Sequence, residues 1–214
     1  MRLHLDDSDA PDWHEVLPHD GSAKFLARML APDEADEMFR LLLDEVPWQS
    51  HDLVLFGKKM TEPRLSAWIG DDGVSYTYSG VPRTPIPWTP TLDVLRRLCE
   101  SRLDAMFPGV RFNSVLANLY RSGDDSMGWH ADDEPELGLN PVIASLTFGD
   151  ERRFDLKHRA SGGTASILLP HGSLLVMSGE TQMHWKHRIA RTKSSRASRI
   201  NLTFRFVLPR TATA

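Results

Sequence analysis

The chain has 214 residues, a formal net charge of −4 at pH 7 and a single cysteine, Cys99. This length suits one well-buried core, the lone cysteine excludes an internal disulfide framework, and no stretch approaches the roughly 18 apolar residues of a membrane span. Because the N-terminus also lacks a basic region followed by an apolar one, we expect an intracellular monomer without an obligate protein partner, cytoplasmic in a bacterium or nuclear in a eukaryote.

The net charge conceals an asymmetry along the chain. Residues 151–214 contain twelve Lys/Arg and three Asp/Glu, a local charge of +9, whereas residues 1–150 contain 13 basic and 26 acidic residues, a charge of −13. The basic part could offer a positive surface to nucleic acid, although ordinary solvated loop charges explain it equally well. Its basic side chains include Arg152, Arg153, Lys157, Arg159, Lys186, Arg188, Arg191, Lys193 and Arg196.

Two helices are expected in the first half of the chain, after an acidic leader. Residues 1–22 contain two prolines and a glycine and predict a flexible segment without chemistry. Pro32 then suits the first position of a helix whose first turn is acidic. The apolar stripe of this helix consists of Phe39, Leu42, Leu43 and Val46. A second helix is predicted from Pro90, with leucines at helical spacing as far as Leu103 and a Pro108-Gly109 stop.

Two aromatic motifs between these helices could contact a planar ligand. Residues 53–57 predict a short strand that ends in a turn, and two lysines follow it. An aromatic ring at such a turn can enter a base stack while the lysines bind phosphates, but these residues alone favour Phe56 as a core residue. Tyr76 and Tyr78 alternate, so both rings should face one side of a strand. They could stack on a nucleobase or pack in the core.

After Arg111 the chain changes to strands. Short apolar segments are separated by turn signals that contain Gly, Pro, Asp and Ser. Many short strands after two helices indicate a closed or double-sheet β architecture with the helices packed outside. The predicted strands are 112–120, 142–148, 153–156, 166–169, 173–177 and 199–207.

His130 and Asp132 form the most informative local motif. In an extended segment, residues two apart project to one side, so an imidazole and a carboxylate could bind the same cation. A third ligand is needed, and His187 is the best-placed candidate because a hydrophilic turn and a polar strand follow it. Two histidines and one carboxylate leave metal positions free, as in non-haem Fe(II) oxygenases, whereas a zinc hydrolase usually has a different ligand set.

The last predicted strand alternates polar and apolar side chains. A solvent-facing strand could look the same, but the apolar face predicts a packed central strand, in which unpaired guanidinium groups would be unstable. Buried arginines require anions, and their planar forks match the carboxylates of a small dicarboxylate. The polar residues are Arg199, Asn201, Thr203 and Arg205. Asn118 and Tyr120 share a face upstream of His130 and add hydrogen-bonding groups beside the metal.

Several segments that occur in a specific order connect this chain with a known family. They are Asn118-X-Tyr120, His130-X-Asp132-Asp133-Glu134, Ile143–Gly149, His171–Met177, His184-Trp-Lys-His187 and Arg199-Ile-Asn-Leu-Thr-Phe-Arg205. Together with Pro63-Arg64 and Tyr76-Thr-Tyr-Ser-Gly80 they closely resemble the AlkB family of iron- and 2-oxoglutarate-dependent dioxygenases. The resemblance is nearest to the animal homologues that repair alkylated DNA, and it spans residues 50–208.

The resemblance implies an α+β, mainly β fold. Its core would be a double-stranded β-helix, the jelly-roll form of these oxygenases, with N-terminal packing helices and a nucleotide-recognition region. Residues 1–22 would be the leader, residues 23–110 the helices and the nucleotide-recognition region, and residues 111–214 the catalytic core. Residues 23–208 would form one integrated domain.

The resemblance also implies an iron site and a cosubstrate site. His130, Asp132 and His187 would be the iron ligands. His184 is the other candidate for the third ligand, but by the resemblance it corresponds to the residue three positions before the family's ligand. Arg199 would bind the distal carboxylate of 2-oxoglutarate. The remaining cosubstrate residues would be Asn118, Tyr120, Asn201, Thr203 and Arg205, the last near the metal-chelating end.

For the substrate, the resemblance implies a nucleobase pocket and an intercalating hairpin. The pocket residues would be Tyr76, Tyr78, Asp133 and Glu134, with Arg64 orienting the acidic pair. Phe56 would be the intercalating wedge, although Leu55 replaces the β-branched residue expected beside it. The basic loops 152–159 and 186–196 would then contact phosphates.

The activity implied is oxidative demethylation of DNA. With Fe(II), 2-oxoglutarate and O₂, the family hydroxylates the N-methyl group of 1-methyladenine or 3-methylcytosine, and the product breaks down to formaldehyde and the repaired base. Asp133 and Glu134 would favour these cationic bases, whose poor pairing also eases extrusion from the stack. Two alternatives stay open: a demethylase acting mainly on RNA or single strands, and a non-catalytic metal-containing β-barrel that binds nucleic acid or a small acid.

Overall fold

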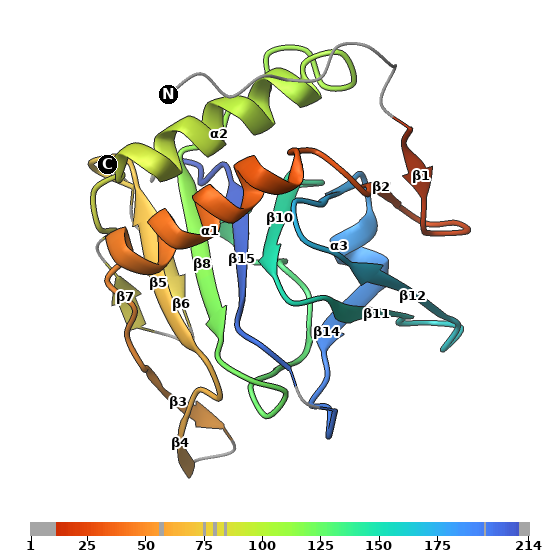
Figure 1. Ribbon diagram of the computed structural model, residues 1–214. Coiled ribbons are helices and arrows are strands. Elements are labelled where there is room, and N and C mark those ends of the chain that lie inside the picture. Colours follow the sequence, from red (N-terminus) through yellow and green to blue (C-terminus); the bar gives the residue numbers. More distant parts are fainter. Residues whose placement is uncertain are drawn as a thin grey trace, which may run out of the picture.

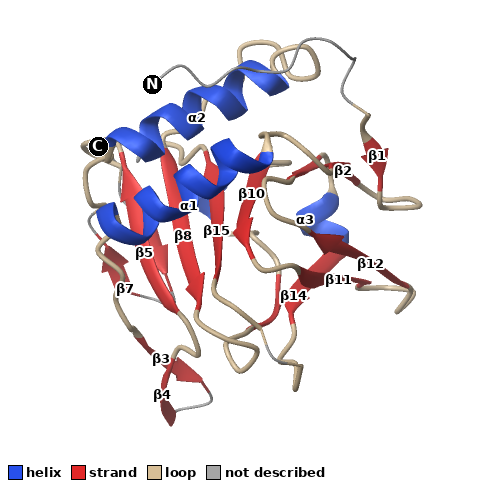
Figure 2. Ribbon diagram, in the orientation of Figure 1, coloured by secondary structure: helices blue, strands red, loops and turns tan. Residues whose placement is uncertain are grey.

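The computed structural model describes residues 12–55, 58–74, 76–78, 81–83, 85–194 and 196–209. Two β-sheets face each other, and two long helices cover the outer face of the larger sheet (Figures 1 and 2). Within the described ranges, no helix has the length and apolar character needed to cross a bilayer. The architecture is the two-sheet, mainly β fold with external helices that the sequence predicts.

The larger sheet contains seven strands, and each pairs with its neighbours in antiparallel fashion. Its order is β1-β2-β13-β10-β15-β8-β5. In chain order these strands are β1 (His14–Glu15), β2 (Ser22–Leu26), β5 (Leu65–Gly70), β8 (Ser114–Tyr120), β10 (Ile143–Gly149), β13 (Leu174–Ser178) and β15 (Arg199–Arg205).

The smaller sheet contains four strands in the order β12-β11-β14-β9. They are β9 (Met127–His130), β11 (Arg152–His158), β12 (Thr164–Leu169) and β14 (Trp185–Ile189). Two further hairpins pair β3 (Asp52–Leu55) with β4 (Lys58–Thr61) and β6 (Tyr76–Tyr78) with β7 (Val81–Arg83). A 3₁₀ turn, η1 (Pro135–Leu137), follows β9, and the short helix α3 (Thr181–His184) precedes β14.

The helices α1 (Pro32–Glu45) and α2 (Pro90–Leu103) lie across the outer face of the larger sheet (Figure 1). Both predicted helices are therefore confirmed, although α2 ends at Leu103, before the Pro108-Gly109 stop. The Thr89 hydroxyl caps α2 by accepting a hydrogen bond from Leu92 N at 3.3 Å. Apolar side chains of both helices share one core with the outer face of β15, which consists of Ile200, Leu202 and Phe204.

The polar face of β15 points away from these helices, into the space between the sheets. Because β15 lies between β10 and β8, its backbone is paired on both sides and its seven residues are all buried. The buried polar residues of this face are Arg199, Asn201, Thr203 and Arg205. The central strand predicted from the alternating pattern is therefore confirmed, and it carries a row of polar groups inside the protein.

The strands predicted after Arg111 all occur, with ends displaced by one or two residues. Strand β8 begins at Ser114 because Phe112 packs beneath α2 against Phe204, and β15 ends before the exposed Phe206. The strands that were not predicted include β2, β5, β9 and β14. Strand β9 reads Met-Gly-Trp-His and has no alternation of apolar residues that would predict a strand. Its extended conformation is stabilised by pairing with β14.

The segment 12–22 differs from the flexible leader that its composition predicts. It contains β1, the edge strand of the larger sheet, it leads into β2, and it buries Leu17 in the core. The indole of Trp185 donates a hydrogen bond to His19 O at 3.1 Å, which ties this segment to β14. Its acidic residues are compatible with order because they lie at the surface while the backbone is paired. Residues 1–11 of the expected leader lie outside the described residues.

Candidate metal and cosubstrate site

Three side chains with metal-ligating groups converge between the two sheets. His130 ends β9, Asp132 follows two residues later, and His187 lies on β14 directly opposite His130 in the sheet register. The two imidazole rings are 4.2 Å apart between centroids, and His130 Nε2 lies 3.9 Å from Asp132 Oδ1. One ligand atom from each residue lies within 4.8 Å of the others. The arrangement offers two imidazoles and one carboxylate to a single ion.

Neighbouring groups hold these side chains in place. His130 Nδ1 lies 2.9 Å from Gly128 O, so this nitrogen donates to the carbonyl and leaves Nε2 as a lone-pair donor for a metal. The backbone N–H of Asp132 donates to Gln182 Oε1 at 2.9 Å. Phe154 stacks on the ring of His187 with centroids 5.1 Å apart. These contacts fix the orientation of the ligands before any ion binds.

The ionisation states also suit a cation. Burial lowers the pKa of His187 to about 3, with a further contribution from His130, so this imidazole is neutral and has a free lone pair at physiological pH. Burial alone would raise the pKa of Asp132, but the positive charge of Arg205 and the nearby histidines lower it below its usual value. Asp132 is therefore an anionic ligand. Two imidazoles and a carboxylate match the donor set of a ferrous site with open positions.

Arg205 lies beside the metal ligands. Its Nη2 donates to Asp132 Oδ1 at 2.8 Å, and both side chains are more than nine-tenths buried. The resemblance predicts Arg205 near the metal-chelating end of the cosubstrate site, and in the structure Arg205 contacts the carboxylate of Asp132. This contact stabilises the buried Asp132 charge and restricts the carboxylate to one orientation.

Arg199 is a buried cation that faces the same cavity. It is 1% exposed, and its Nη2 donates to Thr147 Oγ1 and to Asn201 Oδ1, each at 3.0 Å. Its Nε and Nη1 are buried without a hydrogen-bond partner, and among the described residues no carboxylate forms an ion pair with it. Burial lowers the pKa of Arg199 to about 10, so the group stays charged at neutral pH. A buried charged fork with spare donors fits the carboxylate of a bound acid.

Other polar residues of the predicted cosubstrate site line the cavity around Arg199. Ser145 Oγ donates to Asn201 Oδ1 at 3.0 Å, and Asn201 Nδ2 donates to Thr203 Oγ1 at 2.9 Å. The ring of Tyr120 lies 5.2 Å from the guanidinium of Arg199. The predicted residues that the structure brings together here are Asn118, Tyr120, Arg199, Asn201, Thr203 and Arg205.

Arg64 takes a different position from the one expected. It does not orient the acidic pair Asp133 and Glu134: its Nη2 pairs with the buried Glu62 at 3.1 Å, and its Nε donates to Asn118 Oδ1 at 2.7 Å. Arg64 is itself 2% exposed, so its charge needs a carboxylate in the same buried layer. Arg64 therefore holds Asn118 at the wall of the cavity.

The acidic pair lies at the rim, and Arg159 contacts it instead. Arg159 Nη2 donates to Asp133 Oδ2 at 2.6 Å, while Glu134 has a buried Oε2 without a hydrogen-bond partner among the described residues. Tyr76 and Tyr78 belong to β6, but the structure describes no more than their backbone. Phe56 lies outside the described residues, and the strands on either side of it pair antiparallel with Leu55 opposite Lys58.

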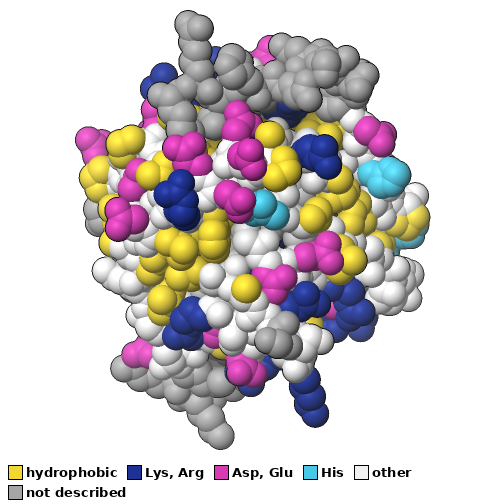
Figure 3. Space-filling model, viewed as in Figure 1, with side chains coloured by type: hydrophobic (Ala, Val, Ile, Leu, Met, Phe, Trp, Pro, Cys, Tyr) yellow, Lys and Arg dark blue, Asp and Glu magenta, His cyan; other side chains and the backbone are white. Residues whose placement is uncertain are grey.

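Part of the basic C-terminal region has a structural role. Arg152 is 3% exposed and donates to the backbone carbonyls of Ser122, Asp125 and Ala190, so it is unsuited to a phosphate contact. Its alternation within β11 turns it inward, which composition alone does not reveal. Lys157 and Lys186, in contrast, are exposed and lie opposite each other on β11 and β14. On the face seen in Figure 3, Lys and Arg side chains lie in small groups among acidic and apolar side chains.

Several residues of the site were not predicted. Phe154 and Gln182 support the metal ligands, but neither carries a local sequence signal for this role. Trp129 precedes His130 and is 38% exposed, and the guanidinium of Arg188 lies 4.4 Å from its ring centroid. An exposed tryptophan next to a predicted ligand is a signal that could have identified this part of the rim. The remaining apolar lining residues are Leu116, Met127, Met177 and Ile189.

Comparisons with known proteins agree with this geometry. Residues 22–205 match the family described as the 2OG-Fe(II) oxygenase superfamily. The chain is 42% identical over 186 residues to alpha-ketoglutarate-dependent dioxygenase alkB homolog 3 of Bos taurus; the match covers 82% of this chain and 63% of that protein. It is 39% identical over 215 residues to DNA oxidative demethylase ALKBH2 of Mus musculus, covering 95% of this chain and 87% of that protein.

A human relative and a solved structure extend the comparison. The human DNA oxidative demethylase ALKBH2 is 37% identical over 212 residues, covering 94% of this chain and 79% of that protein. The structure of OsALKBH1 superposes with a TM-score of 0.63 at 18% identity, covering 89% of this chain and 99% of that one, which shows the shared fold. The chain thus belongs to the AlkB family, within the iron- and 2-oxoglutarate-dependent oxygenases.

Proposed function

We propose that this protein is an oxidative demethylase that removes N-methyl groups from nucleobases in DNA. The observation that carries the proposal is the pairing of two features in one buried cavity. Three ligand groups meet within 4.8 Å of one another, and beside them Arg199 holds unused hydrogen-bond donors without a carboxylate partner among the described residues. Fe(II) would bind the three ligand groups, and a carboxylate of a bound 2-oxo dicarboxylate would accept hydrogen bonds from Arg199.

In this proposal His130, Asp132 and His187 hold the iron, and Arg199 binds the distal carboxylate of 2-oxoglutarate. When bound, the iron and its cosubstrate supply the oxidising power that hydroxylates an N-methyl group. Asn201 and Thr203 share a hydrogen-bond chain along β15, and this chain holds the Arg199 guanidinium in one position. The apolar lining of the cavity excludes water from the reacting methyl group.

The rim of the cavity suits a cationic nucleobase. Asp133 and Glu134 place negative charge next to the ligand Asp132, and a methylated adenine or cytosine ring carries the complementary charge. Arg159 contacts Asp133 and holds its carboxylate at this rim. We assign Tyr76 and Tyr78 to the base pocket and Phe56 to the wedge that fills the stack when a base is extruded. The exposed ring of Trp129, with Arg188 above it, offers a further stacking surface.

The phosphate backbone would contact the exposed lysines. Lys157 and Lys186 are cross-strand neighbours, and two like charges placed opposite each other destabilise a sheet. An anion between them would remove this repulsion, which favours a phosphate partner. Arg152 is excluded from this role by its burial.

Mass spectrometry of a defined oligonucleotide tests the proposal. The protein is incubated with Fe(II), 2-oxoglutarate and ascorbate and an oligonucleotide with one 1-methyladenine, as single-stranded DNA, duplex DNA and RNA in parallel. We expect the DNA lesion to lose the mass of one methylene group and to release formaldehyde, and we expect no change without 2-oxoglutarate. Conversion of the RNA alone would redirect the proposal to RNA, and an unchanged lesion in all three substrates would refute demethylation and favour a non-catalytic binding protein.

A further inference from the structure

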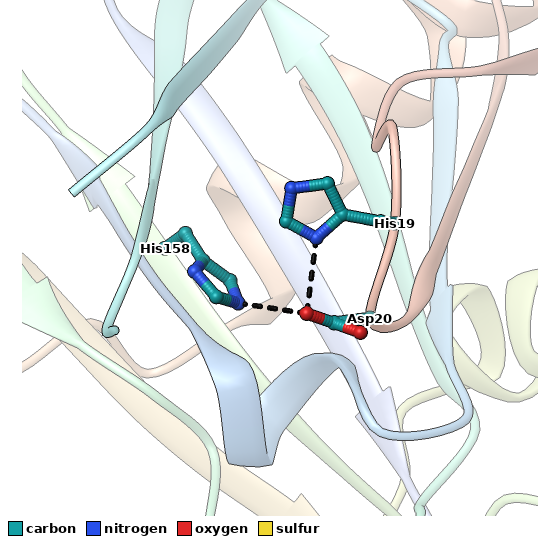
Figure 4. Close-up of side chains that lie close together, drawn as sticks. All are labelled: His19, Asp20 and His158. Atoms are coloured by element: carbon teal, nitrogen blue, oxygen red, sulfur yellow. Dashed lines mark hydrogen bonds and ion pairs between the residues drawn. The ribbon is translucent and has the colours of Figure 1, made fainter. Parts of the chain in front are cut away.

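A second cluster of imidazole and carboxylate groups lies outside the site described above (Figure 4). It consists of His19 and Asp20, in the turn between β1 and β2, and His158, the last residue of β11. His19 Nδ1 lies 3.0 Å and His158 Nε2 lies 3.2 Å from the same atom, Asp20 Oδ2. Both rings therefore direct a nitrogen at one carboxylate, and the three ligand atoms lie within 4.8 Å of one another.

These separations suit a small tetrahedral ion. Zinc binds imidazole nitrogen and carboxylate oxygen at about 2.0–2.2 Å, so two ligands at the tetrahedral angle lie about 3.3 Å apart. The two measured separations need to change by only a few tenths of an ångström to reach this value. Asp20 and His19 are each half exposed, so water has access to complete the coordination.

His158 supplies an independent indication of a ligand. It is 5% exposed, and its Nε2 is buried without a hydrogen-bond partner although it points at Asp20. A buried polar nitrogen in this state is destabilising, and a metal ion would satisfy it. Its Nδ1 lies 2.9 Å from Ser161 Oγ and 3.1 Å from Ser161 N. The backbone N–H of Ser161 donates to Nδ1 in this structure, so zinc binding at Nε2 requires the other tautomer, in which Nδ1 donates its proton to the Ser161 hydroxyl.

The backbone at Asp20 is consistent with a functional role. Asp20 has a φ of 52°, and within the described chain it shares a positive φ with one other non-glycine residue, Asn140. Asp and Asn adopt this conformation more readily than other residues with a Cβ, and here it turns the carboxylate toward both rings. His184 stacks beside His158 at 6.0 Å, but its Nε2 lies 3.5 Å from Glu180, so it falls outside the ligand set.

We propose that His19, Asp20 and His158 form a structural zinc site, separate from the site on β9 and β14. The ion would bind two neutral imidazoles and one carboxylate. It would fasten the β1–β2 turn, which belongs to the larger sheet, to the end of β11 in the smaller sheet. The site would thus link the two sheets, and its existence does not depend on the proposed demethylase activity.

Zinc stoichiometry tests this site with the full-length protein. Metal-free protein is titrated with ZnCl₂ by calorimetry, and bound zinc is counted by mass spectrometry after gel filtration. We expect two zinc ions in the wild-type protein, because zinc also enters the His130–Asp132–His187 site, one in Asp132→Ala and none in the Asp132→Ala/Asp20→Asn double variant. Asparagine accepts a positive φ, so Asp20→Asn removes the anionic ligand without disturbing the turn. The exposed His14→Gln, on the same hairpin, is the matched control and keeps two ions.

Thermal unfolding supplies a second readout. Zinc should raise the Tm of Asp132→Ala and leave the Tm of the double variant unchanged, because only the first retains the proposed site. His19→Gln, at an exposed position, should act like Asp20→Asn, which avoids relying on the buried His158. An Asp132→Ala protein that binds no zinc would overturn the proposal and leave a hydrogen-bonded cluster only. Failure of the demethylase proposal looks different: the lesion stays intact while both zinc counts hold.

Discussion

Substitution of Arg199 by methionine separates cosubstrate binding from folding. Arg199 is 1% exposed, it remains charged because its pKa is about 10, and its Nε and Nη1 have no partner. Methionine has a similar length and fills the same space without the charge. The variant therefore removes the group that we assign to the distal carboxylate and leaves the surrounding strand β15 intact.

The expected magnitude follows from the burial of this charge. Loss of one partner of a buried, hydrogen-bonded charge pair weakens binding by about 2–5 kcal/mol. At about 1.4 kcal/mol per factor of ten, the KM for 2-oxoglutarate should rise roughly 30- to 3,000-fold. Stability should respond much less, because an apolar side chain replaces a buried cation while two hydrogen bonds of about 1 kcal/mol each, to Thr147 and Asn201, are lost.

The assay measures succinate formation as a function of 2-oxoglutarate concentration, together with thermal unfolding of the metal-free protein. Arg196→Met is the matched control, because Arg196 is a partly exposed cation outside the lining of the cavity, with its Nη1 3.6 Å from Asp150 Oδ1. We expect this control to keep the wild-type KM. An identical 2-oxoglutarate titration for Arg199→Met and the wild-type protein would show that another cation binds the cosubstrate.

Three further predictions concern the metal, the substrate and the acid stability. Asp132→Ala should abolish turnover, because it removes the anionic ligand that Arg205 orients; turnover near the wild-type rate would place the metal elsewhere. Phe56→Ala should lower demethylation of duplex DNA at least tenfold, about 1.4 kcal/mol, and spare single strands, and equal losses on both would exclude the wedge. Burial alone would raise the pKa of Asp125, but hydrogen bonds from Arg121 lower it below its usual value. The ionised carboxylate therefore stabilises the fold fully above the unfolded pKa of about 3.9, and this contribution is lost as the pH falls through the lower folded pKa. Asp125→Asn should therefore weaken the fold by about 1–2 kcal/mol at pH 7 and flatten the acid limb of a urea-denaturation series from pH 5 to 2, and an unchanged limb would contradict this assignment.

The sequence by itself determined the elements whose pattern is local. The apolar stripes of α1 and α2 and the alternation along 199–205 depend on spacing, and spacing alone specifies which face of a helix or strand is buried. The His130-X-Asp132 motif belongs to the same class, since residues two apart in an extended chain share a side. For these features the amino-acid order contains the whole physical argument.

Only the tertiary structure decided which distant groups meet. The register of β14 against β9 places His187 opposite His130, and no spacing along the chain specifies this pairing. Arg64 pairs with Glu62 and Asn118 because all three are buried in one layer, so its charge is satisfied there and not at the rim. The turn at residues 19–20 meets the end of β11 because the two sheets pack against each other, and this packing brings distant parts of the chain together. Sequence patterns record burial, whereas the partners of a buried charge depend on which strands lie side by side.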